Sequence, residues 1–338
     1  MKNFEQWYDK KYKKLLFIPA IVLTLSILYL AFFYVQTGDI IYKDVSLTGG
    51  TSITLITDIS AEEMQNALLN EILDFEVKTI SDNSGNQLEL VIIVGEEHSE
   101  DIVSILETIL GEELTQENSS TETTSSSLSA DFYKQLIVAV ILAFFWMAAV
   151  VFLIFTKKKG IKLRIVLLNF LFGFFMGNYF LSINKFLAGI IFVGFSVYFV
   201  QTYIKYSVPA FAVMLAAFAN IVMTLAVVDL IGIKLSTAGI VAFLMLIGYS
   251  VDTDILLTTR LLKKKESINA ALLGAFKTGT TMTITSIIAI TTALIVVFSF
   301  NSVLNQIFTI LLIGLGFDLF NTWVGNASII KWYMENLE

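Results

Sequence analysis

The chain has 338 residues, of which 56% are hydrophobic and only 15% are charged. Soluble domains average about 45–50% apolar and about 25% charged residues, so this composition indicates an integral membrane protein. The lack of cysteine excludes disulfides, thiol chemistry and cysteine-based metal sites, and no cofactor is expected. The single histidine, His98, lies in an acidic, polar region, where a solvated side chain is a better interpretation than a metal ligand.

Eight segments are apolar and long enough to cross a bilayer core of about 30 Å as helices. They cover residues 15–35, 136–155, 163–181, 186–204, 208–231, 236–257, 278–300 and 306–330. A cytoplasmic N-terminus would place 17 of the 22 lysines and arginines on the cytoplasmic side. This bias follows the positive-inside rule and predicts a multi-pass protein of the cytoplasmic membrane, with both termini (1–14 and 331–338) inside.

Residues 36–133 form the only long polar section and would lie outside the cytoplasm. The section holds 20 of the 29 acidic residues and only Lys43 and Lys78 as basic residues. Such an acidic surface argues against binding nucleic acid or anionic lipid. Within 36–117 the predicted order is strand, helix, strand, strand, helix, which is typical of a small ferredoxin-like α+β domain.

The elements of this domain have local signals. Ser60 and Glu63 fit a capping box for a helix that would run to about residue 73, and Ser99 is expected to cap a second helix over 100–110. Strands are predicted at 51–58, 75–81 and 88–94. The last strand of the fold is not evident, and the Ser/Thr-rich stretch 118–133 is interpreted as a linker.

Charged residues interrupt two of the apolar segments. They are Asp252, Asp254 and Arg260 in the sixth segment and Asp318 in the eighth. An aspartate at the bilayer centre costs roughly 2.5–3.5 kcal/mol on insertion scales, so it should face protein or water and have a partner. Asp252 and Asp254 are about 200° apart around a helix, and Arg260 lies about 12 Å along the axis from Asp252. Partners must therefore come from other helices, such as the one with Asp318, or from another protein.

Both a structural and a functional interpretation fit these charges. Arg260 could begin the basic stop signal that continues at Lys263, and the aspartates could simply hold helices together. Alternatively they form a relay for protons or other cations, because a carboxylate that protonates within the membrane couples charge movement to work.

Five segments, in order, resemble motifs of the SecD/SecF family of protein-export membrane proteins in the RND superfamily, especially its archaeal members. They are VSLTGGT with Leu47, Thr48, Gly49 and Gly50, FANIVMTLAVVDLIGIKLSTAG, LIGYSVDTDILLTTR with Gly248, Tyr249 and Ser250, KTGTTMTITS, and GLGFDLFNTWVGNASIIKWY. The resemblance implies an RND-type bundle of six spans. Residues 157–207 are interpreted as an extra hairpin, which makes eight spans in all.

The resemblance also implies a function without enzymatic activity. The chain would assist protein export by using a proton gradient, with SecD, the SecY/SecE channel, the translocating polypeptide and membrane lipid as partners and no nucleic acid. Asp252, Asp254, Arg260 and Asp318 would belong to its ion-coupling region. The family usually has an acid where this chain has Asn220, and an amide cannot carry a proton, so another acid would substitute.

Three alternatives stay open. The chain could be a non-conducting structural subunit that stabilises SecD. It could export small molecules, although such RND proteins usually have twelve spans. It could be an intramembrane aspartyl protease using Asp318 and Asp252, although GLGFD has one residue too many for that motif.

Overall fold

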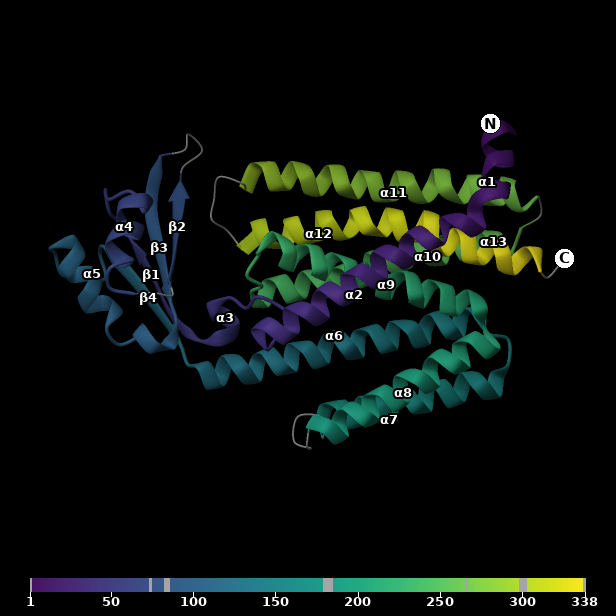
Figure 1. Ribbon diagram of the computed structural model, residues 1–338, viewed down its shortest axis with the longest axis horizontal. Helices are drawn as coiled ribbons and strands as arrows, with labels where there is room; N and C mark the ends of the chain where they lie inside the picture. Colours follow the sequence, from purple (N-terminus) through teal and green to yellow (C-terminus); the bar gives the residue numbers. More distant parts are fainter. Residues whose placement is uncertain are drawn as a thin grey trace.

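The computed structural model describes residues 2–72, 75–81, 86–178, 185–264, 267–297 and 303–336. It forms a bundle of long helices with a small four-stranded domain at one end (Figure 1). The N-terminal and C-terminal helices lie at the opposite end of the bundle, far from the sheet (Figure 1).

Within the described residues, eight helical segments are long and apolar enough to cross a membrane, which confirms the predicted number. They are α2 (Phe17–Thr37), α6 (Ser126–Phe155), α7 (Lys159–Asn178), α8 (Lys185–Tyr206), α9 (Val208–Ile231), α10 (Thr237–Leu262), α11 (Ile268–Val297), and α12 (Val303–Phe320) with its continuation through η2 (Asn321–Asn326) and α13 (Ala327–Glu335). The amphipathic helix α1 (Lys2–Leu15) precedes α2.

Two spans begin earlier than predicted, because polar residues extend their helices beyond the apolar run. α6 begins at Ser126 rather than at residue 136, and α11 begins at Ile268 rather than at residue 278. The start of α6 is fixed by a cap, since the hydroxyl of Ser125 accepts a hydrogen bond from the backbone N–H of Leu128 at 3.4 Å.

The centre of the bundle is built from α9, α10 and α12. Of the spanning windows of α9 and α10, 56% is buried, against 22% for α7 and α8. Small residues permit this close packing: a Cβ on Gly314 of α12 would overlap Leu246 of α10, and one on Gly279 of α11 would overlap Trp323.

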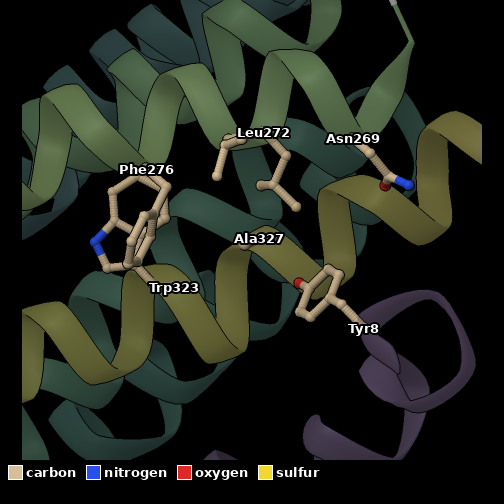
Figure 2. A pocket seen from close by; sticks show the side chains of 7 residues that line it. Tyr8, Asn269, Leu272, Phe276, Trp323 and Ala327 are labelled. Carbon is tan, nitrogen blue, oxygen red and sulfur yellow. The ribbon is translucent and has the colours of Figure 1, made fainter. Parts of the chain in front are cut away.

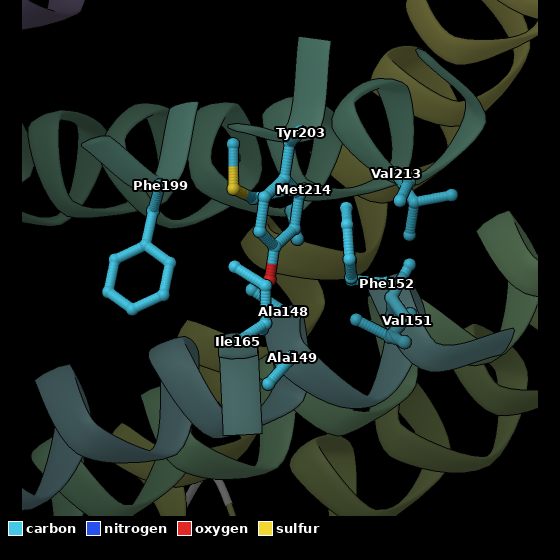
Figure 3. Packing of buried hydrophobic residues seen from close by; sticks show 12 residues of the cluster. Ala148, Ala149, Val151, Phe152, Ile165, Phe199, Tyr203, Val213 and Met214 are labelled. Carbon is cyan, nitrogen blue, oxygen red and sulfur yellow. The ribbon is translucent and has the colours of Figure 1, made fainter. Parts of the chain in front are cut away.

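Helices α7 and α8 form a hairpin at the edge of the bundle (Figure 1). They pack on α6 and α9 through a cluster that includes Phe152, Ile165, Tyr203 and Val213, one residue from each of the four helices (Figure 3). The hairpin was predicted at 157–207, and its status as an addition to a six-span family stays a prediction.

The small domain is a four-stranded antiparallel sheet in the order β2-β3-β1-β4. Its strands are β1 (Gly50–Leu55), β2 (Phe75–Ser81), β3 (Gln87–Val94) and β4 (Ser119–Thr124), and its helices are α4 (Ala61–Leu68) and α5 (Ile102–Leu110). This connection and strand order confirm the ferredoxin-like fold. Ile53 lies opposite Ile92 in the register, and both pack under Met64 of α4 and Leu106 of α5.

Two predictions for this domain were wrong in detail. The stretch interpreted as a linker contains β4, which pairs with β1 from Gly50↔Thr124 to Leu55↔Ser119, and then the start of α6. An edge strand gains its hydrogen bonds from the backbone, so its uniformly polar side chains gave no alternating signal. The helix after Ser60 ends at Leu68, not near residue 73.

Of the two predicted helix caps, one is confirmed and one is wrong. The capping box is confirmed, because the Glu63 N–H donates to Ser60 Oγ at 3.3 Å and the Ser60 N–H donates to Glu63 Oε2 at 3.2 Å. Ser99, in contrast, closes the short helix η1 (Glu96–His98), and α5 follows Asp101. The backbone turns once more before α5 starts, so Ser99 lies too early to cap it.

The VSLTGGT motif joins the small domain to the adjacent end of the bundle. Leu47, in the short helix α3 (Val45–Thr48), is buried with Val228 and Leu235. Gly49 and Gly50 have φ angles of 86° and 142°, which favour glycine. A Cβ on Gly49 would also overlap the backbone of Ser126, so this pair allows β1 to pass directly beside the start of α6.

Candidate functional site

The candidate site is a group of buried polar side chains between α10 and the α12–η2 segment. Asp254 on α10 is 0% exposed and Asp318 on α12 is 1% exposed. Asp254 Oδ1 accepts hydrogen bonds from Thr322 Oγ1 at 2.9 Å and from Asn326 Nδ2 at 2.7 Å. Two donors from the last span thus hold one oxygen of a carboxylate on the sixth span.

The donors lie on η2, a π-helical turn between α12 and α13. A π-helix widens the turn relative to an α-helix and frequently marks a functional position. Thr322 and Asn326 are buried in this turn, and its Trp323 packs edge-on against Phe276 of α11 with ring centroids 5.0 Å apart. The irregular turn therefore sets which side chains face Asp254.

The second carboxylate has a different environment. The Ser250 and Thr322 hydroxyls are its polar neighbours, yet neither Asp318 oxygen is in a hydrogen bond of normal geometry within the described residues. Asp254 Oδ2 also has no hydrogen-bond partner there. The two carboxylates are close enough to interact electrostatically.

No lysine or arginine in the described part of the chain forms an ion pair with Asp254 or Asp318. Two like charges buried together without a fixed cation are strongly unfavourable. The arrangement is therefore suited to bind a proton or another cation.

Other polar groups of the central helices are buried without a partner among the described residues. They are both amide atoms of Asn220 and the hydroxyls of Thr224 and Thr258. Asn220 lies on α9 and is fully buried. Its side chain therefore lies inside the bundle, without a hydrogen-bond partner among the described residues.

Asp252 and Arg260 do not join this group. Asp252 is exposed, as expected for a residue about 200° around the helix from Asp254, and it has no ion pair within the described residues. Arg260 is also exposed, and its Nη1 donates to the backbone oxygen of Gly274 on α11 at 2.6 Å. The expectation of a partner on another helix therefore holds for Asp254 but not for Asp252 in this chain alone.

The residues of the GYS motif lie on two different sides of α10, the buried side with Asp254 and the exposed side with Asp252. Ser250 is buried beside Asp318, whereas Gly248 and Tyr249 are exposed on the same face as Asp252. Asp229, at the end of α9 nearest the small domain, is also buried, with one oxygen 3.5 Å from the backbone N–H of Tyr42.

Sequence reasoning missed Thr322 and Asn326. Their spacing of four residues from Asp318 and from each other was a signal, since it is typical of one helix face. It also missed the burial of Lys331, which is 2% exposed and donates to Asp9 of α1 and to Asn269 of α11. The sequence analysis includes this lysine only among the basic residues that predict the orientation.

An apolar cavity of about 140 Å³ lies next to these residues, between α1, α11 and the last span. Figure 2 shows Tyr8, Leu272, Phe276 and Trp323 around it. The cavity shares Trp323 with the π-helical turn, so open space lies beside the turn that holds Asp254.

The comparison with protein families concerns the same part of the chain. Residues 176–336 match the family model described as protein export membrane protein SecD/SecF, C-terminal. This range contains the whole candidate site.

Several curated archaeal proteins named protein-export membrane protein SecF are similar. The chain is 42% identical to one from Methanolacinia petrolearia over 44% of this chain and 50% of that protein, so it spans about half the length of this relative. It is 29% identical to one from Pyrococcus furiosus over 96% of this chain and 92% of that protein.

The solved structures show the same fold. The crystal structure of SecDF, a translocon-associated membrane protein from Thermus thermophilus, has a TM-score of 0.57 at 12% identity. The match covers 96% of this chain and 38% of that chain, which indicates the RND-type fold for nearly all of the residues. Residues 176–336 thus match the SecD/SecF family of protein-export membrane proteins in sequence, and nearly the whole chain is similar to SecDF in fold.

Proposed function

We propose that the chain is the SecF-type subunit of an accessory complex for protein export, and that the pair Asp254–Asp318 takes up and releases a proton within the membrane. The observation that carries this proposal is the burial of two neighbouring carboxylates without a fixed cation. Such a pair must be neutralised, and a proton does this without enlarging the site.

The proton would be coupled to a conformational change through the π-helical turn. When the pair loses a proton, repulsion between the carboxylates favours moving α10 away from α12. The bonds from Thr322 and Asn326 to Asp254 would then rearrange, because their geometry depends on the π-helical turn. Moving one charge through a potential of 100 mV supplies about 2.3 kcal/mol for such a step.

The orientation follows from charge. The basic N-terminus and, beside it, the C-terminus would lie in the cytoplasm. The small domain at the opposite end would lie outside, where it can meet the translocating polypeptide and the channel. The VSLTGGT connection would transmit movement between the two, because Leu47 is anchored in the bundle while Gly50 begins β1.

The exposed face of α10 would bind a SecD-type partner. Val241, Met245, Tyr249 and Asp252 lie along this face. A charged side chain that faces lipid at this depth costs roughly 2.5–3.5 kcal/mol. A partner helix that offers a polar or cationic group would remove this cost at Asp252.

The test is export of a secreted protein in cells that carry Asp254→Asn or Asp318→Asn. Both variants should lose most export while still co-purifying with the partner, because asparagine keeps the shape but cannot bind the proton. Asp131→Asn, which removes an exposed acid near the start of α6, is the matched control and should export normally. Proton uptake by proteoliposomes of the complex should fall in the same two variants.

Normal export by both carboxylate variants would instead favour the non-conducting structural subunit. The two carboxylates on neighbouring spans also invite comparison with an intramembrane aspartyl protease. Here Asp254 is held by Thr322 and Asn326 rather than by a direct bond to Asp318. Cleavage of a membrane substrate that disappears in Asp318→Asn would establish that alternative over the export function.

A further inference from the structure

A large apolar groove lies between α6, α8 and α9. Its volume is about 580 Å³. Nearly half of its lining residues are aromatic, including Phe144, Phe145, Phe199, Phe211 and Phe218, and its polar lining residues are Ser196 and Tyr203. Figure 3 shows part of this wall, with Tyr203 extending from α8 toward Ala148 of α6.

The groove is open to the outside of the bundle. Val200 on its α8 side is 36% exposed, and Phe218 on its α9 side is 41% exposed. Because these helices are membrane spans, the surroundings of the groove are lipid chains. An apolar groove of this kind fits a hydrocarbon chain and offers few bonds to anything polar.

Cationic side chains gather at the end of the same helices that is remote from the sheet domain. The ring of Tyr206 carries two of them, with Lys158 Nζ 5.4 Å and Lys205 Nζ 5.6 Å from its centroid. Arg164 stacks on Tyr198 with 5.2 Å between Cζ and the centroid. Lys157 and Lys159 are exposed beside them.

These cations have no internal counter-charge nearby in the sequence. No aspartate or glutamate occurs from Phe132 to Val228, a stretch that covers nearly all of α6, the whole hairpin and most of α9. None of these cations forms an ion pair within the described residues. The two ammonium groups on the Tyr206 ring are therefore available to an external anion.

The groove and the cations are continuous. Tyr203, which lines the groove, lies three residues before Tyr206, about 4.5 Å along the helix axis. We propose that this surface binds an anionic membrane lipid, with its phosphate headgroup on Lys158 and Lys205 and one hydrocarbon chain in the groove. Basic pockets between membrane helices are known to hold such headgroups.

The proposal differs from a simple topology signal. The positive-inside bias requires only that basic residues lie on one side, whatever their arrangement. A lipid-binding site, in contrast, requires selectivity for an anionic headgroup and a hydrocarbon chain in the groove. It does not depend on the export function.

The experiment is native mass spectrometry of the purified full chain, titrated with phosphatidylglycerol or phosphatidylcholine carrying identical acyl chains. The wild-type chain should prefer phosphatidylglycerol. Lys158→Gln with Lys205→Gln should reduce this preference by about fivefold for each lysine removed. Lys10→Gln with Lys263→Gln removes the same charge from the same end of the bundle, away from the hairpin, and should leave the preference unchanged.

A second variant tests the groove. Val200→Trp places a large ring at its opening and should weaken binding of both lipids while keeping the headgroup preference. Leu215→Phe, also on the lining, serves if Val200→Trp does not fold, as judged by its thermal midpoint in detergent. The proposal is overturned if the two double lysine variants lose the headgroup preference equally, or if the Lys158/Lys205 variant keeps it. It is also overturned if lipid binding is unchanged when the groove is filled.

Discussion

The centre of the bundle and the α7–α8 hairpin are both made of apolar membrane helices, yet they bury different chemistry. The centre encloses Asp254, Asp318 and Asn220, several of whose polar atoms have no partner among the described residues. The hairpin encloses aromatic rings such as Phe172 and Phe199, with ring centroids 6.4 Å apart. The centre thus holds groups that can change charge, whereas the hairpin holds rings that only pack.

The largest effect is expected at the centre. Asn326→Leu removes one of the two donors to the buried Asp254 carboxylate and should lower the free energy of unfolding by about 3 kcal/mol. Export should fall with it. Unfolding by SDS titration in mixed micelles measures the first effect. Asn336→Leu, an exposed amide after the same helical segment, is the control, and an equal loss there would remove the special role of Asn326.

At Asn220, a substitution is expected to stabilise the fold rather than destabilise it. Neither amide atom has a visible partner, so Asn220→Leu should raise the free energy of unfolding by about 2 kcal/mol. If the amide serves the ion pathway, export should fall in the same variant. A variant that is both destabilised and fully active would show that Asn220 is a structural hydrogen-bonding residue instead.

The hairpin provides the contrast. Phe172→Ala opens a hole among Phe145, Phe195 and Phe199 and should cost about 2 kcal/mol, since lost dispersion contacts are the main loss between helices in lipid. Export should stay near normal. Leu171→Ala, on the adjacent exposed face, should cost little. Export lost in Phe172→Ala with an intact fold would mean that the hairpin takes part in the coupled movement.

The smallest effect is expected at the capping box of the small domain. Its polar groups have hydrogen-bond partners, in contrast to those at the centre of the bundle. Ser60→Ala should cost about 1 kcal/mol. The hydrogen bonds from Ser60 lower the pKa of Glu63 below its ordinary 4.5. Their contribution is present above pH 4.5 and is lost as the pH falls through the lowered value. Amide hydrogen exchange at the start of α4, compared between wild type and Glu63→Gln, should differ at neutral pH and converge in acid.

Much of this protein could be predicted from local signals. The eight spans follow from the length of the predominantly apolar segments, because the bilayer sets a minimum that few other segments reach. The ferredoxin-like order follows from strand alternation and the Ser60–Glu63 cap. The edge strand β4 was hidden, since a polar strand that hydrogen-bonds through its backbone leaves no periodic pattern in its side chains.

The candidate site was only half determined by the sequence. Asp254 and Asp318 were recognisable as charges within spans, and helix periodicity separated Asp254 from Asp252. Tertiary structure decided that Asp254 faces Thr322 and Asn326, because this depends on the π-helical turn and on how α10 crosses α12. It also decided that Arg260 turns to Gly274 and that Lys331 is buried by α1, since contacts between residues far apart in the chain depend on packing that no local pattern encodes.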